Sequence, residues 1–301
     1  MALSSLASTD AEPLVLTIDG AELIAHDASS MTWRWTTSCG RPLRGVVYAA
    51  PGVLPSASSP WRSAASSSMA VVVDDRGTLH LIDATIGREV SAVGPFGEPV
   101  ALAAEGTSIA LAAGRRVRVW HEGVLAEIDR DATALAFGHG QLAIAHARSL
   151  DVYEVATRRV IKTERTVGDV HAVAPHWLAG DWLVGVGQGL LSGERRLTGG
   201  DVRRIAVNTR QRRVAVQRTS THVAVFRASF DLPELRVKYT DRVVAGLALV
   251  GPRVAIGLDH GDANTIHLGP RTKSEPVTRT SRSPERAWAP ELGPDPFPPG
   301  R

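Results

Sequence analysis

Short apolar runs recur along the chain at a nearly constant spacing, and this repetition constrains the fold more than any other feature. Each run consists of Val, Ile, Leu or Ala and is bounded by Gly, Asp, Ser or Arg. Most successive runs begin roughly 30 to 40 residues apart, with one gap of about 56. Runs this short between turn-forming residues predict buried β-strands. They cover residues 15–18, 71–73, 109–112, 142–145, 182–185, 214–216 and 254–257.

Two further classes of strand accompany these runs. A run of alternating character follows several residues later, as in 79–83 and 117–120, and predicts a strand that is half exposed. Another run precedes the first, as in 100–103 and 170–174, and consists mostly of small residues, which suit strands crowded around an axis. The sequence therefore predicts an all-β fold, a single β-propeller of about seven four-stranded blades.

Two segments show the repeat most clearly, Leu79–Val90 and Asp151–Val160. Each combines apolar strand positions and an acid with a short turn containing Thr, then a basic residue and another apolar strand. This pattern resembles that of WD-repeat and YVTN-type propellers, over about 270 residues. The Trp-Asp pair that names the WD repeat is absent. The resemblance extends loosely to the propeller accessory proteins of bacterial systems that pair a MoxR-type ATPase with a von Willebrand A-domain protein, and implies a partner-binding role.

Two segments interrupt the period of the propeller, which is expected to span residues 1–290. Residues 51–68 are rich in Ser, Pro and Ala and predict a flexible insertion in blade two. Residues 291–301 are expected to be a Pro-rich disordered tail.

The first blade lacks an obvious innermost strand, since only Ala2–Leu6 precedes its other strands. Residues 286–290 resemble His171–Pro175, an innermost strand elsewhere, so the tail is a candidate to return and close blade one. The alternative, that Trp288 is an apolar residue in a disordered tail, stays open.

An acid stands just before most of the predicted innermost strands, whereas blade two has Arg41 in that position. Connections into innermost strands lie at one face of a propeller, so these carboxylates are expected to circle one mouth of the axial channel. A ring of that kind concentrates negative potential and would receive a basic peptide or a cation. The alternative is that these residues only start turns by bonding their own backbone. The acids are Glu98, Asp131, Asp169, Asp201, Asp241 and, if the tail closes the ring, Glu285.

Other motifs predict no chemistry, so no metal and no cofactor is expected. The ten histidines have no metal-ligand spacing, and the single cysteine, Cys39, lies in a turn-like segment with no sign of reactivity. The glycines of 185–189 lead into a strand, whereas a dinucleotide site needs a helix there. Trp33 and Trp35 share one face of a strand by their spacing and are expected to pack between blades.

The distribution of arginine and apolar residues indicates which partners and which cellular location to expect. Arginines crowd residues 203–218 without an aromatic platform for bases, so nucleic-acid binding is not expected. The first residues lack the basic and apolar parts of a secretory signal, and no apolar stretch is long enough to span a membrane, so a cytoplasmic location is expected.

These features favour a non-enzymatic scaffold that binds a partner protein or peptide at a propeller face. The alternative is a propeller enzyme (a hydrolase, lyase or oxidoreductase) that uses the carboxylates at the axial channel.

Overall fold

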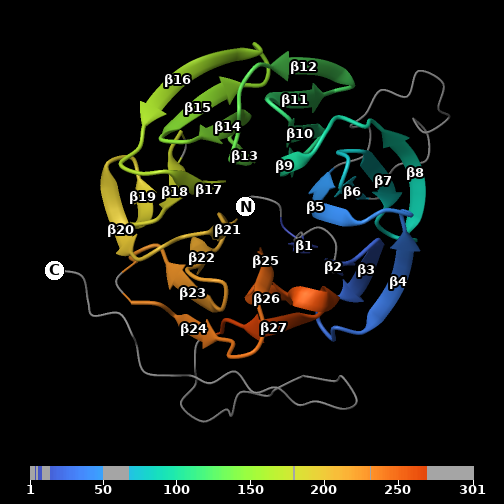
Figure 1. Ribbon diagram of the computed structural model, residues 1–301. Helices are drawn as coiled ribbons and strands as arrows, with labels where there is room; N and C mark the ends of the chain where they lie inside the picture. Colours follow the sequence, from blue (N-terminus) through green and yellow to red (C-terminus); the bar gives the residue numbers. More distant parts are fainter. Residues whose placement is uncertain are drawn as a thin grey trace, which may run out of the picture.

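The computed structural model describes residues 4, 6–8, 14–49, 68–178, 180–230 and 232–269. Within these ranges, the chain forms seven antiparallel sheets arranged as blades around a central axis (Figure 1). Six blades have four strands and the seventh has three in the described part of the chain. The predicted all-β propeller of seven blades is confirmed.

Each blade is one continuous stretch of chain whose strands run in order from the axis to the rim. Blades one and two contain β1 (Leu6–Ser8), β2 (Leu14–Asp19), β3 (Glu22–Asp27), β4 (Trp33–Ser38), β5 (Leu43–Ala49), β6 (Met69–Asp74), β7 (Leu79–Asp83) and β8 (Arg88–Val93). Blades three and four contain β9 (Pro99–Glu105), β10 (Ser108–Ala113), β11 (Arg116–His121), β12 (Val124–Ile128), β13 (Ala134–Gly138), β14 (Gln141–His146), β15 (Ser149–Glu154) and β16 (Arg159–Arg165). Blades five to seven contain β17 (Val170–Pro175), β18 (Trp182–Val186), β19 (Gly189–Ser192), β20 (Arg195–Gly199), β21 (Arg204–Asn208), β22 (Arg213–Gln217), β23 (His222–Arg227), β24 (Leu235–Lys238), β25 (Val244–Val250), β26 (Arg253–Leu258) and β27 (Ala263–His267).

Burial follows the position of a strand within its blade. All residues of β6 and β10, which are second strands, are buried. The outermost β16 is almost entirely exposed. The buried side chains cluster between neighbouring blades, as Val117 of blade three does with Leu142 of blade four. Apolar burial therefore holds each blade against the next.

The ring closes where blade seven meets blade one. The short β1 pairs with the inner edge of β2, in the position that the sequence analysis gave to the tail, while residues 286–290 lie outside the described residues. Leu6 of β1 packs into a cluster with Val15 and Ala255. Arg253 Nη1 also donates to the Ala28 carbonyl over 2.7 Å. Residues 51–67 and 291–301 likewise lie outside the described part of the chain.

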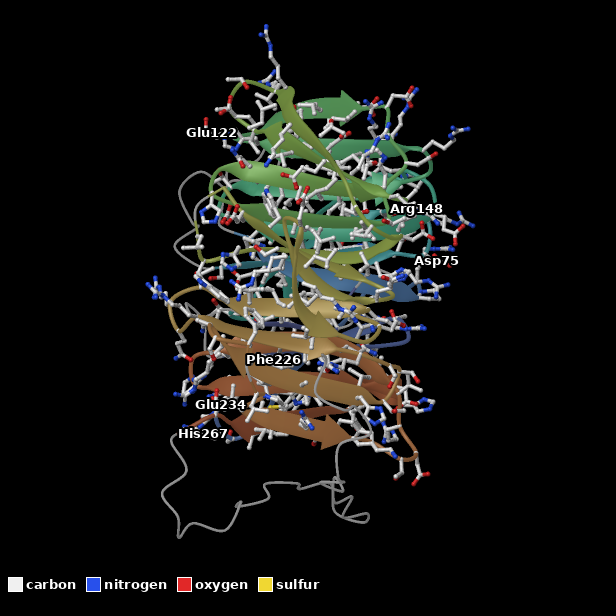
Figure 2. The ribbon with its side chains drawn as sticks, turned by 90° about the vertical axis from the view of Figure 1, so that its left-hand side faces the viewer. Asp75, Glu122, Arg148, Phe226, Glu234 and His267 are labelled. Carbon is white, nitrogen blue, oxygen red and sulfur yellow. The ribbon has the colours of Figure 1, made fainter. Side chains whose placement is uncertain are left out.

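The disk has two faces, which we call top and bottom. The top face carries the connections into the innermost strands and the turns between second and third strands. The bottom face carries the remaining turns. In Figure 2, Asp75 and Arg148 mark the top face on one side of the disk, and Glu122, Glu234 and His267 mark the bottom face on the other.

Of the two tryptophans of β4, Trp35 agrees with the sequence prediction and Trp33 does not. Trp35 is 9% exposed and its indole N–H donates to the Ala84 carbonyl of blade two over 3.0 Å, as expected for packing between blades. Trp33 is 65% exposed. The pairing of β4 with β3 shifts register between these two residues. Such a bulge breaks the alternation on which the prediction for Trp33 relied.

No helix within the described ranges has the length and apolar character needed to cross a membrane.

Candidate interaction face

Five of the six predicted acids lie on the top face, in the connections that lead into innermost strands. Glu98, Asp131, Asp169 and Asp241 are exposed, and Asp201 is half-buried. Glu285 lies outside the described residues. The structure therefore places the five described acids at one end of the axis.

Three of these acids form ion pairs with arginines. Arg115, in the turn between β10 and β11, places its Nε 3.5 Å from Asp131 Oδ1 of the next blade. Arg148, in the corresponding turn of blade four, lies 3.3 Å from Asp169. Asp201 pairs instead with the nearby Arg203, over 2.8 Å. The face therefore carries a ring of mixed charge, whereas the sequence predicted a ring of carboxylates with Arg41 as its exception in blade two.

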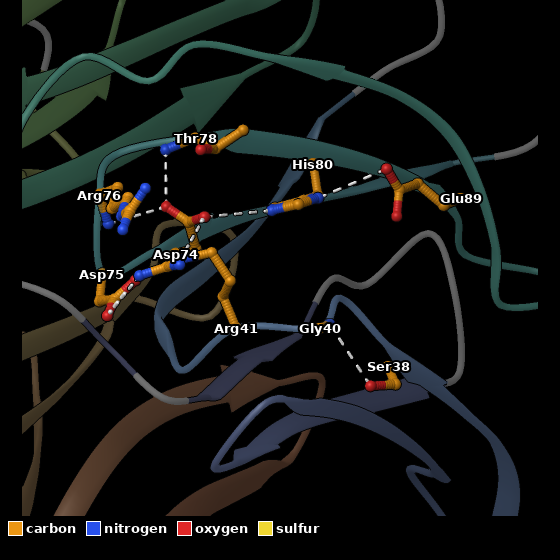
Figure 3. Close-up of polar contacts among 9 residues, drawn as sticks. All are labelled: Ser38, Gly40, Arg41, Asp74, Asp75, Arg76, Thr78, His80 and Glu89. Carbon is orange, nitrogen blue, oxygen red and sulfur yellow. Dashed lines mark hydrogen bonds and ion pairs between the residues drawn. The ribbon is translucent and has the colours of Figure 1, made fainter.

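The order of the charges reverses in blades two and seven. Arg41, at the position that is acidic in other blades, makes a two-pronged contact with Asp75, with distances of 2.9 and 3.2 Å (Figure 3). Arg242, next to Asp241, lies 2.6 Å from Asp259 and 2.8 Å from Asp262. The ion pairs of the top face therefore do not all have the same arrangement of acid and arginine.

These ion pairs are too exposed to contribute much to folding. The Asp131 and Asp169 side chains are each 65% exposed, and their arginine partners more so. Exposed pairs of this kind contribute about 0–1 kcal/mol, because water screens them and the side chains lose entropy. Both partners remain accessible to another molecule.

Backbone hydrogen bonds hold the top-face connections in place. Five of the joints between blades have a hydrogen bond of the same kind. A backbone N–H at the start of one blade donates to a carbonyl of the preceding blade, in or beside the turn that joins its second and third strands. The donor and acceptor pairs are Leu43–Gly20, Gly97–Arg76, Val170–Ala147, Val202–Val186 and Val244–Ser220, with distances from 2.7 to 3.1 Å. At these five joints the charged side chains are thus presented from a fixed backbone, which lowers the entropy lost on binding.

Exposed valines accompany three of the acids. Val167 is 72% exposed and lies two residues before Asp169. Val243 and Val100, also exposed, lie two residues after Asp241 and Glu98. A single exposed apolar residue is ordinary, but the repetition beside the acids gives the top face apolar contact area as well as charge.

Asp74 is a buried carboxylate beneath this face, at the end of β6. Its side chain is 1% exposed, and Oδ1 accepts hydrogen bonds from the N–H groups of Arg76 and Thr78 over 2.9 and 2.8 Å (Figure 3). Burial alone would raise the pKa of Asp74, but these hydrogen bonds and the charge of His80 hold it below its ordinary value. Asp74 therefore fixes the turn that presents Asp75.

Asp151 of β15 is a second buried carboxylate. It accepts hydrogen bonds from Thr163 Oγ1 over 2.6 Å and Arg130 Nε over 3.1 Å, and His146 Nε2 lies 3.1 Å away. Burial would raise the pKa of Asp151, but these contacts lower it. Neither buried aspartate was predicted from the sequence as a functional position, although an acid inside the apolar run Leu150–Tyr153 was a visible signal.

The fold defines the class of the protein, a seven-bladed β-propeller. Comparison by sequence finds no matching family model and no matching curated protein. Comparison by structure finds a chain of the solved "Crystal Structure of Mitotic Checkpoint Complex", with a TM-score of 0.68 and 12% identity. The match covers 88% of this chain and 86% of that one. At this identity the likeness shows the fold alone.

Proposed function

We propose that this propeller is a protein-interaction platform, and that its top face binds a partner protein or peptide. The ring of exposed, oppositely charged side chains around the axis carries this proposal. Such a ring selects partners whose charges are complementary and rejects those that place like charges together. The neighbouring valines add apolar contacts.

We propose a non-enzymatic role in a cytoplasmic multi-protein assembly, such as the bacterial MoxR-type ATPase and von Willebrand A-domain systems that the repeats loosely resemble. The structural neighbour comes from a multi-protein complex, which supports a protein partner in general terms. Catalytic carboxylates are typically tuned by burial, and the exposure of Asp131 and Asp169 supports binding over the enzymatic alternative.

Charge reversal at two positions tests the top face. Replacing Asp131 and Asp169 with Arg puts like charges beside Arg115 and Arg148, and we expect partner capture to fall at least about tenfold, equivalent to about 1.4 kcal/mol. The measurement is quantitative affinity capture with cross-linking and mass spectrometry, at two salt concentrations, since charge recognition weakens with salt.

The matched control reverses two exposed acids of the bottom face, Glu122→Arg and Glu194→Arg. This variant should capture the same partner as the unmodified protein, and both variants should keep the same melting temperature. Equal capture by the top-face variant, or loss only in the bottom-face variant, would count against the proposed face.

A further inference from the structure

Three side chains with metal-binding atoms meet between blades one and two. Cys39 comes from the connection that leaves β4, His80 from β7 and Glu89 from β8. One potential ligand atom of each lies within 4.8 Å of those of the other two. His80 Nδ1 is 3.4 Å from Glu89 Oε1 (Figure 3). The cluster adjoins the top-face ring through Asp74, whose Oδ2 lies 3.7 Å from both His80 Nε2 and Arg41 Nε.

This combination of donors suits a cation of the zinc class. Zinc binds thiolate sulfur, imidazole nitrogen and carboxylate oxygen at about 2.0–2.3 Å with tetrahedral geometry, which places ligand atoms about 3.3–3.8 Å apart. The distance of 3.4 Å between His80 Nδ1 and Glu89 Oε1 already lies in this range. The other separations are at most 4.8 Å and need a contraction of up to about 1 Å. Calcium and magnesium prefer oxygen ligands alone and fit the set less well.

The buried His80 ring lies between Glu89 on its Nδ1 side and Asp74 on its Nε2 side. Its side chain is 9% exposed, and Nε2 has no hydrogen-bond partner among the described residues. Nε2 points toward Asp74 Oδ2, 3.7 Å away (Figure 3). A small rotation of the ring would complete a hydrogen bond. Metal-binding histidines usually donate their second N–H to a carboxylate, which fixes the ring and its tautomer.

Asp74 is well placed for this supporting role. Its other oxygen, Oδ1, is already held by the N–H groups of the turn that follows β6. The carboxylate therefore stays fixed while Oδ2 faces the imidazole. Glu89, in contrast, is 38% exposed, so the cluster has access to solvent on its side.

We propose that Cys39 Sγ, His80 Nδ1 and Glu89 form a binding site for one divalent cation of the zinc class, with Asp74 as the positioning residue of His80. Three protein ligands leave a fourth position, open to water beside Glu89. The bound ion would tie the connection after blade one to the two outer strands of blade two.

The single cysteine of the chain provides a direct test, because every labelled thiol reports Cys39. Protein without a histidine tag is titrated with Zn²⁺, and the rate of labelling by a thiol reagent is measured. We expect one equivalent of Zn²⁺ to slow labelling at least about tenfold and a chelator to restore the rate, because a metal-bound thiolate is shielded and less nucleophilic. Metal analysis after dialysis should give about one zinc per chain.

Substitutions separate a coordinated ion from an adventitious one. Cys39→Ser should abolish the cobalt–thiolate absorption that Co²⁺ gives with the unmodified protein, and Glu89→Gln should weaken zinc binding. Asp74→Asn keeps an acceptor oxygen for the turn and should lower zinc affinity about 10–100-fold, as loss of such a supporting carboxylate typically does. His146→Gln is the matched control, since it removes a histidine beside another buried aspartate and should leave zinc binding unchanged.

Circular dichroism establishes that each variant is folded before its affinity is compared. Labelling that is independent of Zn²⁺ would overturn the proposal. So would equal zinc affinity in the unmodified protein and in a folded Glu89→Gln variant.

Discussion

Leu6→Ala is expected to lower the free energy of unfolding by about 2–5 kcal/mol, the range for truncating a large buried side chain. Leu6 is 2% exposed and is the main apolar contact of β1 at the joint between blades one and seven. A cavity at this position weakens ring closure as well as the local core. Urea unfolding followed by circular dichroism measures the change.

Gly246→Ala tests the same joint by a substitution in blade seven. A Cβ at Gly246 would lie 2.4 Å from Leu6 Cβ and 2.7 Å from the Leu6 backbone nitrogen, so β1 must move to admit it. Overpacking of this kind costs about 1–3 kcal/mol. Gly187→Ala is the matched control, because a Cβ there meets nothing within 4 Å.

Closure of blade one by the C-terminal residues is tested by a deletion. Deleting residues 284–301 should leave the melting temperature unchanged if β1 alone completes blade one. A large fall after this deletion, together with a mild effect of Leu6→Ala, would assign the closing role to the tail.

Asp151→Ala is the second substitution with a large expected effect, a loss of about 3 kcal/mol in the free energy of unfolding at neutral pH. The carboxylate is 2% exposed, and its removal leaves the Thr163 hydroxyl without its acceptor and His146 Nε2 with only Ser149 Oγ, 3.3 Å away. Hydrogen bonds to a charged group contribute about 1.5–3 kcal/mol each. The contribution of Arg130 is smaller because that side chain is 51% exposed.

The pH dependence of Asp151→Ala follows from the direction of the pKa shift. Although burial opposes it, hydrogen bonding lowers the pKa of Asp151 in the folded state. A group of this kind stabilises the fold above its unfolded pKa of about 4, and the stabilisation is lost as the pH falls through the folded value. The difference between the unmodified protein and Asp151→Ala should therefore shrink below about pH 4.

The exposed Asp169→Ala variant serves as the control for Asp151→Ala and should change stability little at any pH. A constant difference between the unmodified protein and Asp151→Ala from pH 7 to pH 3 would contradict the role assigned to the buried carboxylate.

The repeat made the fold predictable because each blade must bury the same kinds of strand in the same order. The innermost strand of blade one was harder to predict, because β1 has only three residues. So short a strand shows less of the repeat pattern than residues 286–290, which resemble an innermost strand elsewhere in the chain. The exposure of Trp33 depends on a bulge, and strict alternation cannot represent a bulge.

The candidate interaction face was only partly visible in the sequence. The acids could be found because they precede recognisable strands. Their partners Arg115 and Arg148 lie in turns of the preceding blade, so the pairs become apparent only when neighbouring blades are aligned. Cys39, His80 and Glu89 come from separate elements and form no spacing motif, so only folding brings them together.

The closure of the disk has a mechanical consequence. Among the described residues, five joints have a backbone hydrogen bond between blades, whereas the joints between blades three and four and between blades seven and one have none. The chain runs directly from blade three into blade four, so only the joint between blades seven and one lacks both a hydrogen bond of this kind and a direct chain connection. The disk is thus a linear array of sheets bent into a circle and fastened by side-chain packing and the Arg253 contact. Separation of blades seven and one would break no strand pairing within a sheet. We therefore expect the ring to open first at this joint under mechanical load, by local opening and not by global unfolding.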